Sequence, residues 1–355
     1  HGFLLYVLQQ GSPGDRAALC FDAPGTGHLQ RDLHSVNQPT PAIVAQGAVR
    51  RLPRIALWLF CAAYVLPGFI DRAPWKSADM TAFGYMLALA HGASGWLHPL
   101  LLGLPPETDG PLPYWLGALA LQAAPSWITP AFAARIPFVI LLSLTLVATW
   151  YGIYYLARSP QAQPVRFAFG GEAKPADYAR AMADGGLLAL VACLGLAQLS
   201  HEITPALTQL CFTALTFYAV AAAPYRTVGP AISLAIGMAG LVASGAPTMA
   251  TLFAAGSALL CLAEPRQSPA ERRRSLLWGC GIVVMIVLAG LLAQWLDLWR
   301  WRAALPENRW LTWRNLGRLL LWFTWPAWPL AVWTIWRWRH QLASRELSRH
   351  LALPL

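Results

Sequence analysis

Apolar residues along the chain are grouped into long, nearly uncharged runs that short polar segments separate. Several of these runs approach the roughly 20 residues that a helix needs to cross the hydrocarbon core of a bilayer. The pattern predicts an all-α fold, namely a polytopic transmembrane helical bundle with about eight spans. The expected spans are residues 55–70, 136–157, 186–200, 203–223, 228–243, 247–263, 276–296 and 316–336.

The composition agrees with a chain embedded in a membrane. Of the 355 residues, 57% are hydrophobic and only 12% are charged, whereas soluble domains average about 25% charged residues. The net charge of +10 does not indicate a nucleic-acid partner, because the basic residues flank apolar runs and form no single patch. The six cysteines have no CxxC spacing, so we expect neither a metal site nor a disulfide framework.

A further apolar segment at 111–124 is short and rich in proline at its start, and its placement decides the topology. If it does not cross the membrane, most of the 26 Lys and Arg share one side, as the positive-inside rule requires. We therefore expect residues 71–135 to form a first outer loop with juxtamembrane helices. The corner at 201–202, the turn at 243–247 and the loop at 297–315 then lie on the same outer side.

The chain divides into three expected parts. Residues 1–50 mix Gly, Pro, Gln and Asp without periodicity and are expected to be poorly ordered. Residues 51–340 carry the spans and form the transmembrane domain. Residues 341–355 are expected to be a cytoplasmic tail or the start of a further C-terminal portion.

Four segments, in order, carry a resemblance to a known family. They are "IDRAPWKSADMTAFGYM" (70–86), "GWLHPLLLGLPPETDGPLPYWLGALA" (95–120), "AARIPFVILLSLTLVATWYGIYYLAR" (133–158) and "LVASGAP" (241–247). With them the chain resembles the polyprenyl-phosphate-sugar-dependent glycosyltransferases of the GT-C fold, specifically the lipid A aminoarabinose transferase and protein O-mannosyltransferase group. It departs from that pattern in lacking the Asp-Glu pair after the first span and the Lys before Pro-Pro-Leu.

The resemblance implies a function and a location. A GT-C enzyme moves a sugar from a polyprenyl-phosphate carrier to a lipid, glycan or protein acceptor. The expected location is the bacterial inner membrane, with the active site on its periplasmic face. A divalent metal is left open as a cofactor. Family members continue with further spans and often a soluble domain, so we expect this chain to be truncated at its C-terminus.

Sugar transfer needs a base for the acceptor hydroxyl and cationic partners for the leaving phosphate. Asp71 follows the first span directly and is the preferred base, while Asp79, about two helical turns further on, is the alternative. Arg72 and Lys76 are candidate ligands of the donor phosphate. The alternative is that these charges only mark the end of a span or attract lipid headgroups.

The rest of the first outer loop adds three candidate substrate-binding residues. Glu107 and Asp109 precede "GPLPYW", where an acidic pair could bind an amino sugar or a metal, and Tyr114 belongs to that same motif. Solvation of an ordinary loop is the alternative for the two acids.

Two more polar sites are candidates elsewhere in the chain. His201 and Glu202 interrupt a nearly continuous apolar stretch, where ionisable residues are costly unless they are used. Arg300 and Arg302 lie among tryptophans in the loop 297–315, a composition suited to a lipid phosphate. A simple turn and an interfacial anchor, respectively, are the alternatives.

Two other function classes compete with the enzyme. A lipid-handling or transport protein has a similar span pattern, but transporters usually carry charges or broken helices near the bilayer midplane. Here the polar residues gather on one predicted face, which favours chemistry at the surface. A degenerate, non-catalytic family member is the third alternative, since the family's Asp-Glu pair and its Lys are absent.

Overall fold

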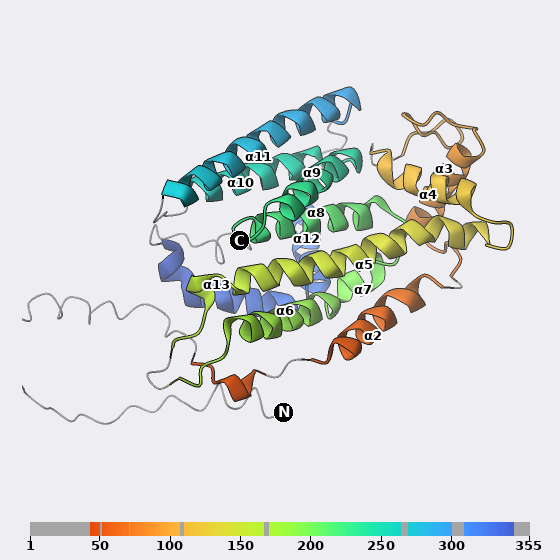
Figure 1. The fold of residues 1–355 in the computed structure, drawn as a ribbon. Coiled ribbons are helices and arrows are strands. Elements are labelled where there is room, and N and C mark those ends of the chain that lie inside the picture. Colours follow the sequence, from red (N-terminus) through yellow and green to blue (C-terminus); the bar gives the residue numbers. More distant parts are fainter. Residues whose placement is uncertain are drawn as a thin grey trace, which may run out of the picture. The chain divides into compact units, whose positions relative to one another are not determined.

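The computed structural model describes residues 43–49, 52–70, 72–106, 110–166, 170–263, 269–299 and 309–343, all of which belong to the unit Pro39–Leu355. Within these ranges the secondary structure is helical, apart from two isolated β-bridges. The prediction of an all-α fold is therefore confirmed for the described part of the chain (Figure 1).

Proline sets the start of many of these helices. Because its fixed φ suits the first turn and its missing N–H needs no partner there, it is favoured at that position. The first residue is proline in α5, α6, α8, α10 and α11. The helices are α2 (Arg54–Val65), α3 (Ser77–Ala90), α4 (Leu112–Ala123), α5 (Pro130–Ala157), α6 (Pro175–Val191), α7 (Leu194–Leu199), α8 (Pro205–Ala222), α9 (Val228–Ala243), α10 (Pro247–Ala263), α11 (Pro269–Trp295), α12 (Arg309–Phe323) and α13 (Ala327–Ala343), with 3-10 turns at Gln46–Ala48, Leu66–Gly68 and Pro160–Ala162.

Three of the described helical segments are long and apolar enough to cross a membrane, namely Pro130–Ala157, Pro205–Ala222 and Arg272–Trp295. Shorter apolar helices cover Arg54–Gly68, Val228–Ala243 and Pro247–Cys261. The chain thus has the helices of a membrane protein, and the full set of about eight spans stays a prediction. Helix α4 has 12 residues, which is less than a crossing requires.

Two of the predicted spans are broken, and the structure puts both breaks in the same place. The run 186–200 is split between α6 and α7, and the run 316–336 is split between α12 and α13. Pro326 accounts for the second break, because proline restricts the residue before it and donates no hydrogen bond. The first break has a tertiary cause, since the Leu194 N–H donates to the carbonyl oxygen of Trp325 at 3.1 Å.

One predicted loop assignment also needs correction. The C-terminal part of the predicted loop 297–315 is helical, because α12 begins at Arg309. Residues 43–49, at the end of the N-terminal segment 1–50, contact the start of α6. The Gln46 side chain accepts a hydrogen bond from the Lys174 N–H at 2.6 Å and donates one to Asp177 at 2.9 Å. This glutamine satisfies polar groups that the helix start leaves open.

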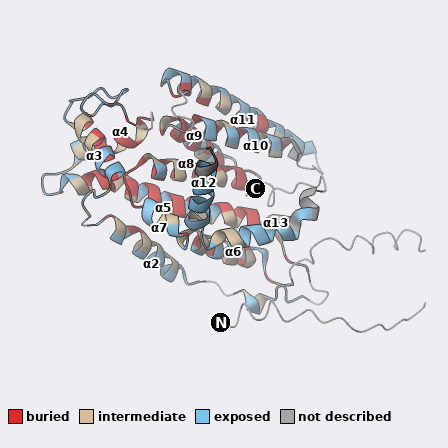
Figure 2. Cartoon of the chain, turned by 180° about the vertical axis from the view of Figure 1, so that it is seen from behind, coloured by how far each residue is buried: buried red, intermediate tan, exposed pale blue. Residues whose placement is uncertain are grey.

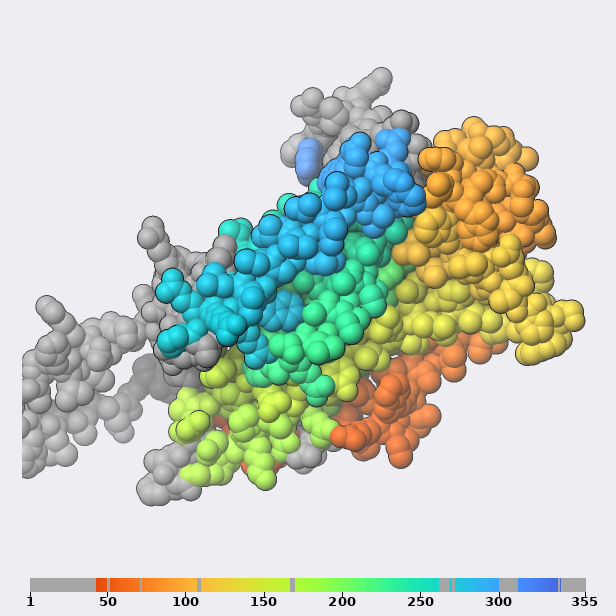
Figure 3. Space-filling model, turned by 45° about the horizontal axis from the view of Figure 1, so that its top comes forward, coloured from red at the N-terminus to blue at the C-terminus, as the bar shows by residue number. Residues whose placement is uncertain are grey.

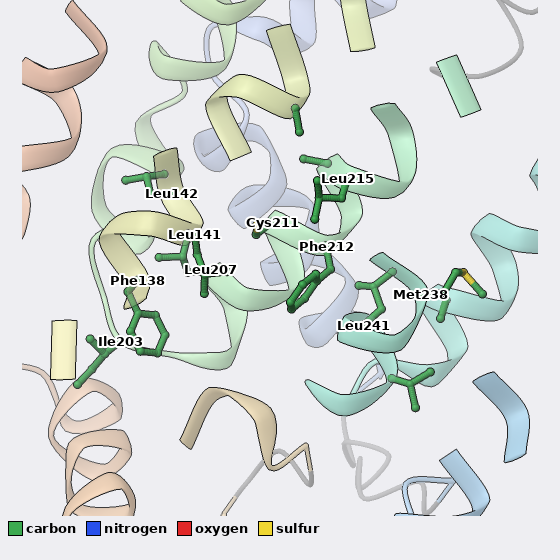
Figure 4. Packing of buried hydrophobic residues seen from close by; sticks show 14 of the residues in the cluster. Phe138, Leu141, Leu142, Ile203, Leu207, Cys211, Phe212, Leu215, Met238 and Leu241 are labelled. Atoms are coloured by element: carbon green, nitrogen blue, oxygen red, sulfur yellow. The ribbon is translucent and has the colours of Figure 1, made fainter. Parts of the chain in front are cut away.

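The core forms around α5 and α8, with α6 on α5 and α9 on α8 (Figure 1). Close-range packing joins Phe138, Leu141 and Leu142 of α5 to Leu207 and Cys211 of α8 (Figure 4). Buried positions concentrate in these helices, whereas α12 and α13 are mainly exposed (Figure 2).

Glycines let the helices approach one another. Gly240 of α9 lies against the ring of Phe212, and Gly152 of α5 lies against Phe217. Helices in lipid lack a hydrophobic drive toward one another, so small residues that permit close contact matter more than in water. At the surface of the bundle, α11 crosses the face seen in Figure 3. It exposes Val283, Val284 and Val287, as contact with lipid requires.

We predict that Gly240→Ala lowers the thermal stability of the purified protein in detergent. Its new methyl group would overlap the Phe212 ring, and overpacking of this kind costs about 1–3 kcal/mol. Gly256→Ala on α10 is the matched control, because nothing lies within 4 Å of the added carbon. Equal melting temperatures for the two variants would contradict the packing shown for α8 and α9.

Candidate functional site

Segments that are distant in sequence meet at the end of the bundle where α5 and α8 begin, beside α3 and α4 (Figure 1). Asp79, in the first turn of α3, is at the centre of this junction. Its Oδ2 accepts a hydrogen bond from Arg135 Nη2 at 3.0 Å, and its Oδ1 accepts one from the Ile203 N–H at 2.9 Å. One carboxylate thus joins α3, α5 and the corner before α8.

This geometry argues against Asp79 as the general base, although sequence reasoning offered it as one of two alternatives. The residue is only 1% exposed, and each of its oxygens already accepts a hydrogen bond. A base must reach the proton of an acceptor hydroxyl. Asp79 is better described as a positioning residue for the junction.

Arg135 is the functional candidate that sequence reasoning did not single out. It is 0% exposed, and its Nε and Nη1 atoms have no hydrogen-bond partner. A buried guanidinium that keeps open donors is rare enough to need an explanation. The available signal was a lone charge entering an otherwise apolar span, which is costly unless it has a use.

A second ion pair ties the first loop to the same corner. Lys76 directly precedes α3, and its Nζ lies 2.7 Å from Oε1 of Glu202. The Glu202 side chain is 3% exposed and the Lys76 side chain 29%. The lysine therefore anchors the corner while part of its side chain stays exposed.

Two cations share one aromatic ring beside this pair. The Arg72 guanidinium lies 5.2 Å and the Lys76 ammonium 5.4 Å from the ring centroid of Trp75. Trp75 itself is exposed. The ring attracts each cation, and both are charged donors of the kind that pairs with a phosphate.

His201 has a different position from the one expected of a substrate ligand. It is buried, with Nε2 2.9 Å from the Tyr64 carbonyl oxygen and Nδ1 3.0 Å from that of Ala197. Its ring packs on Tyr64 and Phe69, and Gly68 leaves the space that the ring occupies. The imidazole therefore connects the end of α2 with the corner at 201–202.

The "GPLPYW" segment reaches the turn at 243–247. Gly110 lies so close to Ser244 and Gly245 that a side chain at position 110 would overlap their backbone. Tyr114 is buried, with its ring 5.2 Å from that of Tyr85, so it belongs to the packed interior of this end. Two of the segments that carried the family resemblance are thus in contact.

Part of the predicted site cannot be placed. Asp71, Glu107, Asp109, Arg300 and Arg302 lie outside the described residues. Within the described ranges, no group of three or more His, Cys, Asp or Glu is arranged to hold a metal ion. The structure brings together Arg72, Lys76, Asp79 and Glu202, while His201 and Tyr114 are buried in the interior of this end.

We predict that Asp79→Asn lowers the free energy of unfolding by about 3–5 kcal/mol, because it leaves the buried Arg135 without its counter-charge. Chemical unfolding in detergent measures this change. Asp184→Asn is the matched control, since that buried carboxylate accepts a hydrogen bond from the neutral Trp150 indole and its loss should cost about 1 kcal/mol. The double variant Asp79→Asn/Arg135→Gln should recover stability. An Asp79→Asn change no larger than that of the control would refute the ion pair.

Comparisons with models of protein families, with curated proteins and with solved structures found no match. A function for this site therefore rests on its own geometry and on the sequence motifs that led to it.

Proposed function

We propose that this chain is a membrane glycosyltransferase that uses a polyprenyl-phosphate-linked sugar as donor. The reaction would take place at the junction of the first loop with the corner at 201–202, facing the periplasm in a bacterial inner membrane. The observation that carries the proposal is the pair of cations, Arg72 and Lys76, over the exposed Trp75 ring. Lys76 also pairs with Glu202, and Arg135 pairs with Asp79, in a chain whose apolar helices carry few charges.

The chemistry fits a single displacement. The acceptor oxygen attacks the anomeric carbon of the sugar, the bond from that carbon to the phosphate oxygen breaks, and polyprenyl phosphate leaves. The acceptor proton passes to a carboxylate, for which Asp71 is the candidate. Arg72 and Lys76 stabilise the negative charge that grows on the leaving phosphate, where prearranged cations have their largest effect.

The remaining ion pairs prepare the site. Lys76 donates one of its three ammonium N–H groups in a hydrogen bond to Glu202, and this contact fixes the direction of the chain there. Asp79 and Arg135 fix the start of α3 against α5. Fixing groups in this way lowers the reorganisation that the transition state would otherwise require.

We predict that Asp71→Asn reduces sugar transfer at least about 100-fold, the usual effect of losing a general base. Lys76→Gln should reduce kcat on the order of 100-fold, as the loss of one charge-stabilising donor does. The measurement is transfer from a panel of polyprenyl-phosphate sugars to lipid, glycan and peptide acceptors by the protein in nanodiscs.

Lys174→Gln is the matched control, because Lys174 is the other lysine of the chain and precedes α6, away from the junction. It should transfer sugar at the unaltered rate. If no donor supports transfer by the unaltered protein, the enzyme assignment fails. If both lysine variants lose activity equally, the assigned role of Lys76 fails.

A lipid-handling protein is the second candidate, and one observation favours it. An apolar groove of about 360 Å³ is lined by Leu194, Leu321, Trp322, Trp325 and Trp328. It lies where α7 begins and α12 meets α13, and an acyl or prenyl chain would fit its chemistry. Lipid movement between vesicles, without sugar transfer in the assay above, would select this alternative.

A further inference from the structure

Three arginines gather at the opposite end of the bundle, where α5 and α8 end and α11 begins. The turn Ala223–Thr227 is their common point. Arg226 belongs to this turn, Arg158 follows α5, and Arg274 lies in the first turns of α11. The three residues come from three separate segments of the chain, so only the fold brings them together.

Two contacts fix this cluster. The Arg158 guanidinium lies 5.8 Å from the ring centroid of Tyr225, and Arg274 Nη2 donates to the Ala223 carbonyl oxygen at 3.0 Å. Arg274 also holds its Nε in a buried position without a hydrogen-bond partner. The Arg274 guanidinium therefore donates one hydrogen bond to the protein through Nη2, while its buried Nε–H donates none.

The three arginines take no part in the ion pairs observed among the described side chains. Three cations around one short turn repel each other, and an anion between them would remove that cost. Arg226 and Arg158 are exposed, so a ligand can reach the cluster from outside.

Aromatic side chains near the three arginines indicate where the cluster lies relative to the bilayer. Tyr225 stacks on Tyr155 with the ring centroids 5.3 Å apart, and Trp150 stacks on Tyr154 at 5.5 Å. Tyr and Trp favour the headgroup level of a bilayer. Both stacks lie on the last turns of α5 or beside them, so the arginines are at the height at which lipid phosphates lie.

We propose that Arg158, Arg226 and Arg274 form a binding site for the headgroup phosphate of an anionic phospholipid. The site is in the leaflet opposite the candidate catalytic junction and is independent of the proposed sugar transfer. Guanidinium groups pair with phosphate oxygens through parallel hydrogen bonds, and a lipid bound to the native state stabilises it. Its phosphate would link the ends of α5, α8 and α11.

The test is the melting temperature of the purified protein in a neutral detergent, with dioleoylphosphatidylglycerol, dioleoylphosphatidylcholine or inorganic phosphate added. We expect phosphatidylglycerol to raise the melting temperature by several degrees, and the other two additives to leave it nearly unchanged. Arg158→Gln/Arg226→Gln should lose this increase while keeping the melting temperature of the lipid-free protein. Arg158→Lys/Arg226→Lys should retain part of it.

Arg54→Gln/Arg166→Gln is the charge-matched control, since both residues are exposed arginines outside the cluster. It should keep the full increase with phosphatidylglycerol. Loss of the increase in this control would mean that net charge alone attracts the lipid, and would overturn the site. An equal increase with inorganic phosphate, or none with phosphatidylglycerol, would overturn it as well.

Discussion

The buried ion pair between Arg135 and Asp79 is the interaction on which the candidate site depends. A carboxylate and a guanidinium that are 1% and 0% exposed need each other's charge, because neither is solvated by water. Asp79 also accepts the Ile203 N–H, so the pair determines where the corner before α8 lies. Removing either charge would release α3, and with it the loop that carries Arg72 and Lys76.

The two ends of the bundle differ in how their charged side chains are paired. At the junction, buried charges are paired, and Lys76 neutralises Glu202 at the edge of solvent. At the other end, Arg158 and Arg226 have no carboxylate partner in the described ranges and sit among tyrosines. The first arrangement fits a preorganised site, while the second fits contact with an anionic membrane surface. Between the two ends, Gly152 and Gly240 let the helices pack closely against Phe217 and Phe212.

Much of the local structure was predictable, because hydropathy and proline act over short distances. The apolar runs at 136–157, 203–223 and 276–296 became the long helices α5, α8 and α11. The breaks within 186–200 and 316–336 were missed. Pro326 was a usable signal for one of them, but the other depends on a hydrogen bond from Leu194 to Trp325, which no local pattern contains.

The sequence by itself determined the helical class, the apolar runs and the polar residues set between them. It also pointed to the region of Lys76 and to the corner at Glu202 as places where charge was not required by the membrane. Only the tertiary structure decided that Asp79 is buried against Arg135, 56 positions away, and is therefore a poor base. The physical reason is that hydropathy is a property of neighbouring residues, whereas burial and ion pairing depend on which helices pack together.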